Sequence, residues 1–466
     1  MNYVTNPMRA ACALLLALAI PAGTAWAAPP GLGQYPSAAN LVLPSLQSAL
    51  DKVRAEKFDA TWLEQKVVSD DGQAGDLFGF RVLVWGDTAF ISAPAPLYRS
   101  GKVYVMKNVA GVWTETQQLA ATPSIAPPPN WSDFFGWSLS LSGDTLLVGA
   151  PEVFNPMFGP VGGAYVFVRS GDTWVQQQEL LGADSGNFDW VGSAVALAGD
   201  TAFVGAPNHD ANKGTVYVFT RSGTTWSEGT ALVASDGASG DAHQFGGAIK
   251  CDDNTLIIGA PGPDYSSTGI YAPGEAYAFE NSGGVWTEAQ ILRPDDGADG
   301  DQFGYSLAIS GTELLIGAPA ANIGANSHQG AAYLFDGTSG TWSQTTKLTV
   351  DSGVAYDQLG QSVALQDSTV LVGMWSHNDD FNSPPAPPKP GSAYLFSGSQ
   401  GNWSLSNQFT ASDATDGDSF GWDVAMDGTT LAVGSQGPVD GNEFQGATYF
   451  YVSNDTIFAD GFDGAH

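Results

Sequence analysis

Pairs of aspartates recur along the chain at a nearly constant separation. Five pairs are five residues apart and a sixth pair is six apart; they are Asp71/Asp76, Asp184/Asp189, Asp236/Asp241, Asp296/Asp301, Asp413/Asp418 and Asp351/Asp357. Carboxylate oxygens at this spacing, with Gly or Ser between them, are suited to a hard cation such as Ca²⁺. The competing interpretation is that each Asp closes a tight turn by hydrogen bonding to its own backbone.

The richest of these loops runs from Asp295 to Asp301 and also contains Asp299, and the last loop also contains Asp416. One loop departs from the pattern, because it is rich in Pro and contains only Asp133. With Ca²⁺ as the candidate cofactor, the candidate ligands are Asp71, Asp76, Asp236, Asp241, Asp296, Asp299, Asp301, Asp413, Asp416 and Asp418. Turn closure remains the alternative for all of them.

Other catalytic chemistry has little support in the residue pattern. His209, His243, His328 and His377 are scattered, with one in each of four segments, and none has the spacing of a zinc site. No Gly-x-Ser-x-Gly elbow accompanies a suitable His. Asp is so abundant that no single carboxylate pair stands out for glycoside chemistry. We therefore name no catalytic residue and expect a protein that is not an enzyme.

The acidic loops lie within a longer repeat. An Asp-x-Phe-Gly-like step recurs every 54 to 61 residues, with its Gly at Gly79, Gly136, Gly192, Gly246, Gly304, Gly360 and Gly421. Each step is followed by a short strand, a Gly-Ala-Pro-like step, a strand with Tyr and a strand with Trp. Four short strands per unit, repeated seven times, predict an all-β fold, a seven-bladed propeller of four-stranded antiparallel blades. We expect the recurring Tyr and Trp residues between blades, in the core, rather than on a sugar-stacking surface.

The two ends of the repeat region are out of phase with each other. The chain enters on a Trp strand at Trp62, before any Phe-Gly step, and leaves after the Tyr strand that contains Tyr449. The strand around Trp62 to Val68 is therefore expected to complete the last blade and close the ring, since an open ring leaves an unpaired edge.

The motifs resemble the FG-GAP repeats of integrin α-subunit propellers and of exported bacterial proteins. Phe78-Gly79, Phe303-Gly304 and Phe420-Gly421 match the first half of the repeat, and Gly149-Ala150-Pro151 and Gly317-Ala318-Pro319 match the second. The resemblance implies adhesion receptors, lectin-like modules or appendages on enzymes. The calcium loops of integrin blades do not carry over, because hairpins such as Ser142-Gly143-Asp144 are too short to supply enough oxygen ligands.

Composition and the N-terminus indicate an exported protein. Residues 1–27 have a basic start, an apolar run and a small-residue end, which together predict a signal peptide. The organisation expected is 1–27 signal peptide, 28–58 lead segment, 59–452 propeller and 453–466 tail. With Lys+Arg 16 and Asp+Glu 48, the net charge of −32 disfavours nucleic acid and anionic lipid as partners. No later stretch predicts a membrane span, and Cys251, the one Cys after the signal peptide, is expected to pack as a small apolar residue.

The loops after each Gly-Ala-Pro-like step differ most between units, and they are expected on the same face as the acidic loops. Variable loops with aromatic residues on a rigid scaffold are typical recognition sites, although simple drift gives the same pattern. The candidate ligand-binding residues are Tyr265, Tyr271, Trp375, His377, Asp379 and Phe381. We therefore expect a monomeric, secreted or cell-surface adhesion module for a glycan or an extracellular protein. A propeller hydrolase or lyase with carboxylates near the central channel, and a structural component of an envelope or matrix, are the alternatives.

Overall fold

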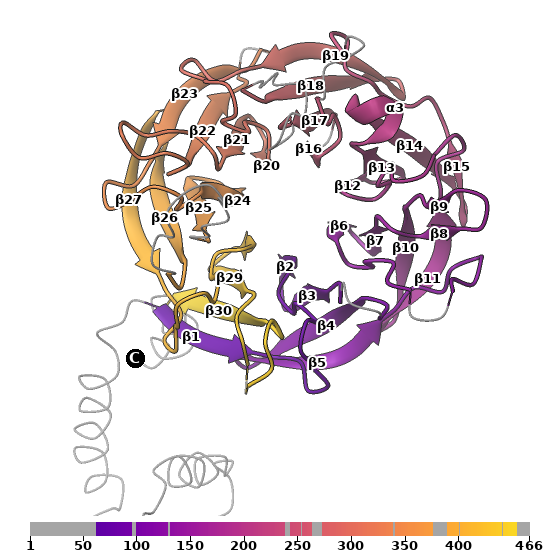
Figure 1. Ribbon diagram of the computed structural model, residues 1–466, viewed down its shortest axis with the longest axis horizontal. Helices are drawn as coiled ribbons and strands as arrows, with labels where there is room; N and C mark the ends of the chain where they lie inside the picture. The colour runs from indigo at the N-terminus through magenta and orange to yellow at the C-terminus, as the bar shows by residue number, and fades with distance from the viewer. Residues whose placement is uncertain are drawn as a thin grey trace, which may run out of the picture. The chain divides into compact units, whose positions relative to one another are not determined.

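The computed structural model describes residues 62–95, 99–128, 131–237, 243–252, 254–262, 273–338, 341–375, 389–399, 401–439 and 441–453. These residues form a ring of seven four-stranded antiparallel blades (Figure 1). The predicted seven-bladed propeller is therefore confirmed. The predicted signal peptide, lead segment and nearly all of the tail lie outside the described residues.

Every blade has the same strand order from the central channel outward. The strands, from inner to outer, are β2 (Val82–Trp85), β3 (Thr88–Ala93), β4 (Lys102–Val109) and β5 (Val112–Leu119) in blade 1; β6 (Ser138–Ser142), β7 (Thr145–Ala150), β10 (Gly163–Ser170) and β11 (Thr173–Leu180) in blade 2; β12 (Val195–Ala198), β13 (Thr201–Ala206), β14 (Thr215–Ser222) and β15 (Thr225–Glu228) in blade 3; β16 (Ala248–Asp252), β17 (Thr255–Ala260), β18 (Glu275–Ser282) and β19 (Val285–Leu292) in blade 4; β20 (Ser306–Ser310), β21 (Glu313–Ala318), β22 (Ala331–Asp336) and β23 (Ser343–Leu348) in blade 5; β24 (Leu359–Gln366), β25 (Thr369–Met374), β26 (Ser392–Ser399) and β27 (Asn402–Phe409) in blade 6; and β28 (Val424–Asp427), β29 (Thr430–Ser435), β30 (Ala447–Ser453) and β1 (Trp62–Val67) in blade 7. Blade 2 carries an additional hairpin of β8 (Phe154–Asn155) and β9 (Gly159–Pro160), and blade 3 a single turn, α3 (His209–Asn212).

The first strand of the chain closes the ring. β1 pairs antiparallel with β30, with Trp62 opposite Ser453 and Val67 opposite Thr448. The Trp62 ring packs edge-on against Phe409 of blade 6, with ring centroids 5.3 Å apart. The predicted closure by the N-terminal strand is confirmed, and it joins the two ends of the propeller in one sheet.

The glycines of the repeat allow neighbouring blades to approach closely. A Cβ atom at Gly149, in the Gly-Ala-Pro step of blade 2, would lie 2.0 Å from the carbonyl oxygen of Gly192, in the Phe-Gly step of blade 3. A Cβ at Gly434 would lie 2.0 Å from the carbonyl oxygen of Gly79, so the same contact seals the ring between blades 7 and 1. Only glycine permits this backbone-to-backbone approach.

A third recurring glycine was not singled out from the sequence. It lies three residues before the Tyr that recurs in each repeat, at Gly101, Gly162, Gly214, Gly274, Gly330, Gly391 and Gly446. At Gly446 the backbone φ is 82°, and an added Cβ would lie 2.1 Å from the carbonyl oxygen of Phe78 in blade 1. A Gly-x-x-Tyr spacing repeated seven times was the signal available in the sequence.

The recurring aromatic residues fill the spaces between blades. Tyr104, Tyr165, Tyr217, Tyr277, Tyr333 and Tyr394 are among the largest fully buried side chains. One cluster joins Phe90 of blade 1 to Tyr165 and Trp174 of blade 2, and the rings of Trp113 and Phe450 stack across the seam between blades 1 and 7. The structure thus places these Tyr and Trp residues in the inter-blade core, as expected, and leaves them unsuited to stacking on a sugar.

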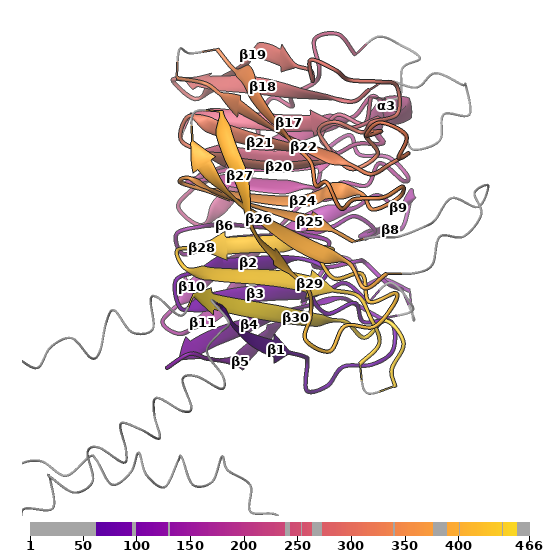
Figure 2. The same ribbon diagram turned by 90° about the vertical axis from the view of Figure 1, so that its left-hand side faces the viewer.

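The two ends of the ring differ in the length of their connections. The loops between blades and the loops between the second and third strands of each blade lie at one end, which we call the loop face; the short turns that close the other hairpins lie at the opposite end, the hairpin face. β8, β9 and α3 all project from the loop face (Figure 2). Hydrogen bonds connect the two kinds of loop, such as Phe188 N to Pro160 O at 2.7 Å and Leu77 N to Phe444 O at 3.0 Å.

Candidate functional site

The first Asp of each pair accepts a hydrogen bond from a Tyr hydroxyl in five of the repeats. In each case the Asp lies in the loop that enters a blade, and the Tyr lies in the third strand of that same blade. The hydroxyl-to-carboxylate distances are 2.9 Å for Tyr104–Asp71, 2.7 Å for Tyr217–Asp184, 2.8 Å for Tyr277–Asp236, 3.1 Å for Tyr333–Asp296 and 2.8 Å for Tyr449–Asp413. These carboxylates therefore tie the entering loop to the blade behind it.

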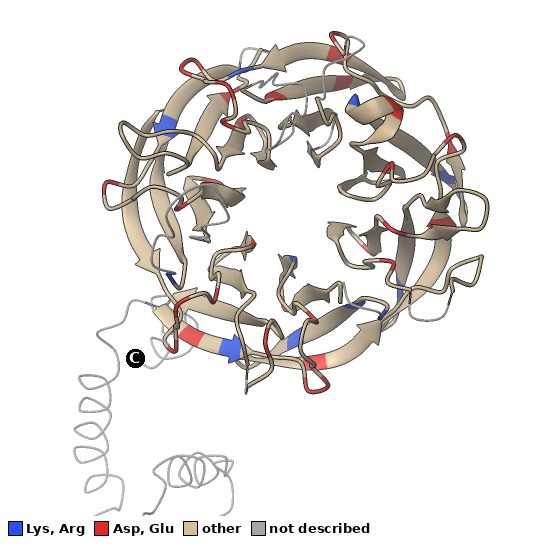
Figure 3. Cartoon of the chain, in the orientation of Figure 1, with Lys and Arg blue, Asp and Glu red and all other residues tan. Residues whose placement is uncertain are grey.

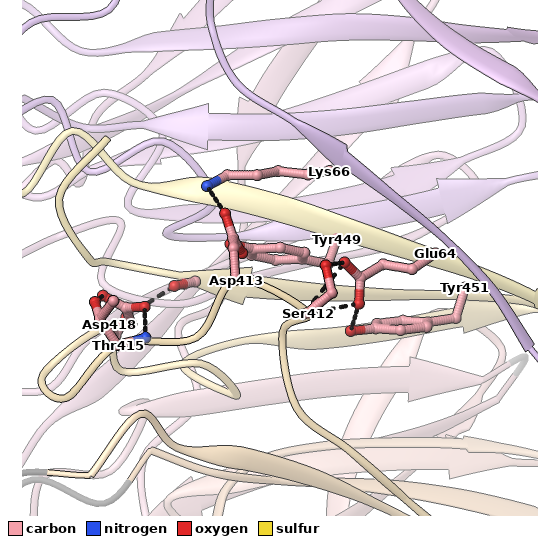
Figure 4. A network of polar contacts seen from close by, with 9 residues as sticks. Glu64, Lys66, Ser412, Asp413, Thr415, Asp418, Tyr449 and Tyr451 are labelled. Carbon is pink, nitrogen blue, oxygen red and sulfur yellow. Dashed lines mark hydrogen bonds and ion pairs between the residues drawn. The ribbon is translucent and has the colours of Figure 1, made fainter. Parts of the chain in front are cut away.

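Lysines add a second contact to three of these carboxylates. Lys66 lies 2.6 Å from Asp413, Lys347 lies 2.7 Å from Asp296, and Lys102 contacts Asp71. Figure 4 shows Asp413 between Lys66 and Tyr449 at the seam where β1 closes the ring. Partial burial of Asp413 disfavours its charge, but the hydrogen bonds from Lys66 and Tyr449 outweigh this effect and lower its pKa.

In the five pairs whose second Asp the structure describes, this residue faces its own turn. Its carboxylate accepts the backbone N–H three residues earlier, from Gln73 to Asp76 (2.7 Å), Gly186 to Asp189 (2.6 Å), Ala298 to Asp301 (2.9 Å), Val354 to Asp357 (2.8 Å) and Thr415 to Asp418 (2.6 Å). In the Pro-rich loop, Asp133 instead accepts the N–H of Phe135 at 3.1 Å. This geometry supports turn closure. The donor is the N–H three residues before the Asp, whereas in an ordinary Asx-turn the donor lies two residues after it.

In the pair Asp236/Asp241, the position equivalent to the second Asp of the other pairs is not occupied by Asp241. The residue two positions before Phe245 is His243, and its carbonyl accepts the N–H of Gly262 as the carbonyl of Asp76 accepts that of Ala95. His243 thus occupies the place of the second Asp in the loop that enters blade 4. Asp241, which was paired with Asp236 by its five-residue spacing, lies outside the described residues.

In four pairs, Asp71/Asp76, Asp184/Asp189, Asp296/Asp301 and Asp413/Asp418, the two aspartates have different hydrogen-bond partners. Among the described residues, no three His, Cys, Asp or Glu side chains gather as a metal ion requires. The side chains of Asp299 and Asp416 are exposed to solvent. Oδ1 of Asp301 is buried and forms no hydrogen bond of ordinary geometry, although the backbone N–H of Asn322 interacts with this carboxylate and opposes the rise in its pKa that burial causes.

Apolar side chains are exposed on the loop face where blades 2 and 3 meet. Met157 and Phe158 lie in the turn between β8 and β9, and Phe188 and Trp190 lie in the adjoining inter-blade loop. Their exposed fractions are 80% for Met157, 48% for Phe158, 53% for Phe188 and 38% for Trp190. The hydrogen bond from Phe188 to Pro160 joins the two loops, so we call these four residues the blade 2–3 patch.

Phe188 occupies a backbone position that favours glycine. The residue before the second Asp has a positive φ in five repeats, and it is Gly75 (79°), Gly300 (85°) or Gly417 (92°) in three of them. Phe188 (63°) and Tyr356 (66°) adopt the same conformation with a large side chain. A left-handed conformation costs a residue with a Cβ roughly 1–2 kcal/mol.

Of the ligand-binding residues predicted from the sequence, the structure places one. Trp375 is half-buried, and its ring packs edge-on against Trp422 with centroids 4.7 Å apart. Tyr265, Tyr271, His377, Asp379 and Phe381 lie outside the described residues. The blade 2–3 patch was not predicted, and the signal available was an aromatic residue where other repeats have Gly.

The sequence also matches a known family of repeats. A family model described as FG-GAP repeat matches residues 62–106, 113–167, 174–219, 226–279, 286–335, 342–396 and 403–451, which together make up more than half of the chain. The chain belongs to the FG-GAP repeat family. A search of curated proteins found no match.

The limits of the FG-GAP matches explain how the ring closes. Each match begins in the Trp strand of one blade and ends in the Tyr strand of the next, so the sequence repeat spans two blades. The first match therefore starts in the outer strand of blade 7 and the last ends in the third strand of the same blade. In the described part of this FG-GAP propeller, no helix has the length and hydrophobicity needed to cross a bilayer.

The inner strands of the FG-GAP propeller are edge strands, and side chains from the preceding blade cap their N–H groups. Ser140 accepts the N–H of Leu197 at 3.0 Å, and Gln366 accepts that of Gly428 at 2.8 Å. Oδ2 of Asp423 accepts the N–H of Val82 at 2.8 Å. These contacts satisfy groups that an open edge leaves unpaired, and they explain the small polar residues around the channel.

The inner strands surround a cavity of about 300 Å³. Its lining residues are mostly uncharged (Figure 3), and the charged ones are Arg81, Lys250 and Asp423. Burial raises the pKa of Asp423, and the charge of Arg81 opposes this effect. Most glycosidases use two carboxylates at their catalytic site, and the described lining of this cavity contains one, Asp423.

Proposed function

We propose that this FG-GAP protein is an exported binding or adhesion module that recognises a glycan or a protein ligand through its loop face. The observation that carries the proposal is Phe188, an exposed aromatic residue held in a left-handed conformation where three other repeats have glycine. The rigid ring supports the loop on which it lies, as recognition loops require.

The chemistry of the blade 2–3 patch suits both kinds of ligand. Exposed Trp and Phe rings present large apolar faces that lose little conformational entropy when they are covered. Met157 adds a flexible apolar side chain that adapts to different surfaces. Asn187, which is exposed, precedes Phe188 and has its Oδ1 beside Gly159, so it offers a hydrogen-bond acceptor next to the patch.

The test is binding of the mature protein, residues 28–466, to an array of glycans and extracellular matrix proteins. The variant Phe188→Gly introduces the residue that other repeats use at this place, so we expect it to fold and to lose specific binding. The matched control is Val285→Ser, which changes an exposed apolar residue at the hairpin face. Binding unchanged in Phe188→Gly, or absent from the unmodified protein, contradicts the proposal and favours a structural role or the carboxylate enzyme.

We also propose calcium as a cofactor of this module, and the buried Oδ1 of Asp301, which forms no hydrogen bond of ordinary geometry, supports it. The same array is run with added Ca²⁺ and with a chelator. Loss of binding in chelator, with recovery on adding Ca²⁺, supports a calcium-dependent module. Equal binding in both buffers contradicts a calcium requirement and leaves turn closure as the role of the aspartates.

A further inference from the structure

Lys250 is a charged residue of the channel whose ammonium group does not contribute a contact to the fold. It lies in β16, four residues after the Gly of its Phe-Gly step, and it lines the central cavity. At the equivalent position the other six blades have small or apolar residues, Leu83, Ser140, Ala196, Ala308, Ala364 and Ala425. Among the described residues, none forms a hydrogen bond or an ion pair with the side chain of Lys250.

The other two charges of the cavity already interact with each other. Asp423 accepts the N–H of Val82 through one oxygen, and its other oxygen lies 3.7 Å from Nη1 of Arg81. Arg81 and Lys250 against Asp423 leave one positive charge in excess within the described lining. This excess is unusual in a chain with a net charge of −32, and a single negative charge balances it.

The ring encloses the Lys250 ammonium group, although its side chain remains in contact with water in the channel. Enclosure lowers the pKa of Lys250, and the charge of Asp423 opposes this effect. Because no described side chain of opposite charge pairs with the ammonium group, an anion that accepts its hydrogen bonds gains a charge-assisted contact there.

We propose that the central channel binds a small molecule carrying one carboxylate group, with Lys250 and Arg81 as the groups that hold the carboxylate. The cavity volume of about 300 Å³ lies at the lower end of the range for small-molecule sites. Gln361 and the half-exposed Tyr305, which are hydrogen-bonded to each other at 3.2 Å, also line the cavity and offer polar contacts to the rest of the ligand. A multiply charged anion fits less well, because the rest of the molecule repels it.

This site lies in the channel and not at the blade 2–3 patch, so it goes beyond the proposed function and does not depend on it. Two sources of the carboxylate are consistent with the chemistry, a free organic acid and an acidic sugar. Isothermal titration calorimetry of the mature protein with sodium lactate and with sodium glucuronate separates them. Glucose serves as the uncharged match for glucuronate, and sodium sulfate as a test for binding by charge alone.

The decisive variant is Lys250→Met, which keeps the length of the side chain and removes its charge. We expect a carboxylate to bind the unmodified protein and to lose about tenfold or more in affinity in Lys250→Met. Lys107→Met is the control, because Lys107 forms an ion pair with Asp87 at the hairpin face and should leave carboxylate binding unchanged. Thermal unfolding provides a second readout, since the carboxylate should raise the Tm of the unmodified protein and not that of Lys250→Met.

Each other outcome overturns the proposal. The channel is not a carboxylate site if lactate and glucuronate both fail to bind, or if they bind Lys250→Met as tightly as the unmodified protein. The same conclusion follows if sulfate binds as tightly as the carboxylates. Loss of array binding in Phe188→Gly with carboxylate binding intact separates the two sites, because that variant changes only the loop face.

Discussion

At the residue scale, four of the aspartate pairs combine one hydrogen bond between distant segments with one inside a turn. Asp413 contacts Tyr449 and Lys66, which lie far from it in the sequence, whereas Asp418 bonds to the backbone N–H of Thr415 in its own loop. The first Asp therefore stabilises the packing of a loop on a blade, and the second fixes the shape of the turn. Losing either carboxylate has a different consequence.

The pH dependence of stability follows from the first Asp of each pair. Asp71, Asp296 and Asp413 have a lowered pKa in the folded protein, because hydrogen bonds from Lys and Tyr outweigh partial burial. Their contribution to stability is present above the pKa of an unfolded Asp, about 3.9, and is lost as the pH falls through the lower folded value. We expect Asp413→Asn to be less stable than the unmodified protein at pH 7, with the difference shrinking below about pH 4.

Urea unfolding of both proteins at several pH values measures this difference. Asp416→Asn is the control, because Asp416 is exposed in the same loop and should change stability little at any pH. A stability difference for Asp413→Asn that stays constant down to low pH would show that the ionised form is not what stabilises the loop.

At the element scale, the outer strands of neighbouring blades are joined by a recurring side-chain contact. A Gln amide in one outer strand donates to the backbone carbonyl of the Trp in the next outer strand and accepts that residue's N–H. The pairs are Gln65–Trp113, Gln117–Trp174, Gln178–Trp226 and Gln290–Trp342. Because outer strands are edge strands, this contact satisfies backbone groups that the sheet leaves unpaired.

Removing one such contact should weaken the junction between two blades. In Gln117→Leu, both hydrogen bonds to Trp174, each 2.8 Å long, are lost at a half-buried site. We expect the free energy of unfolding to fall by about 1–3 kcal/mol. Chemical denaturation measures it, and Gln118→Leu, at the exposed neighbouring position, should change it by less than about 0.5 kcal/mol. Equal effects of the two variants would contradict the role assigned to Gln117.

At the scale of the whole molecule, the stability of the ring depends on the seam, the junction at which the first and last strands of the chain meet. The seam consists of the β1–β30 pairing, the Trp113–Phe450 stack and the contacts of Glu64 and Lys66 with blade 7 and its entering loop. A ring of similar blades has no stable end, so an unclosed seam exposes the core of the last blade to water.

Deleting residues 59–68 should therefore destabilise the entire propeller. The deletion removes β1, exposes Phe409 and Tyr451, and loses the partial burial of Trp62, which is worth less than the roughly 1.5–3 kcal/mol of a fully buried large apolar side chain. We expect a lower Tm in a single cooperative transition, measured by circular dichroism. Leu63→Ala, at an exposed position of β1, should leave the Tm nearly unchanged. A deletion variant with the Tm of the full protein would show that the N-terminal strand does not hold the ring together.

The sequence by itself determined the fold, the number of blades and the closure by the Trp62 strand, because strand periodicity, turn residues and repeat phase are written in short segments. Only the tertiary structure decided what the aspartates contact, since the Tyr that binds Asp71 comes from a different strand of the folded blade. It also revealed that Phe188 is held in a conformation suited to glycine, because backbone φ depends on how the loop packs on its neighbour. Lys250, Arg81 and Asp423 line one channel although they are far apart in the sequence, because closing the ring brings all seven inner strands around one axis.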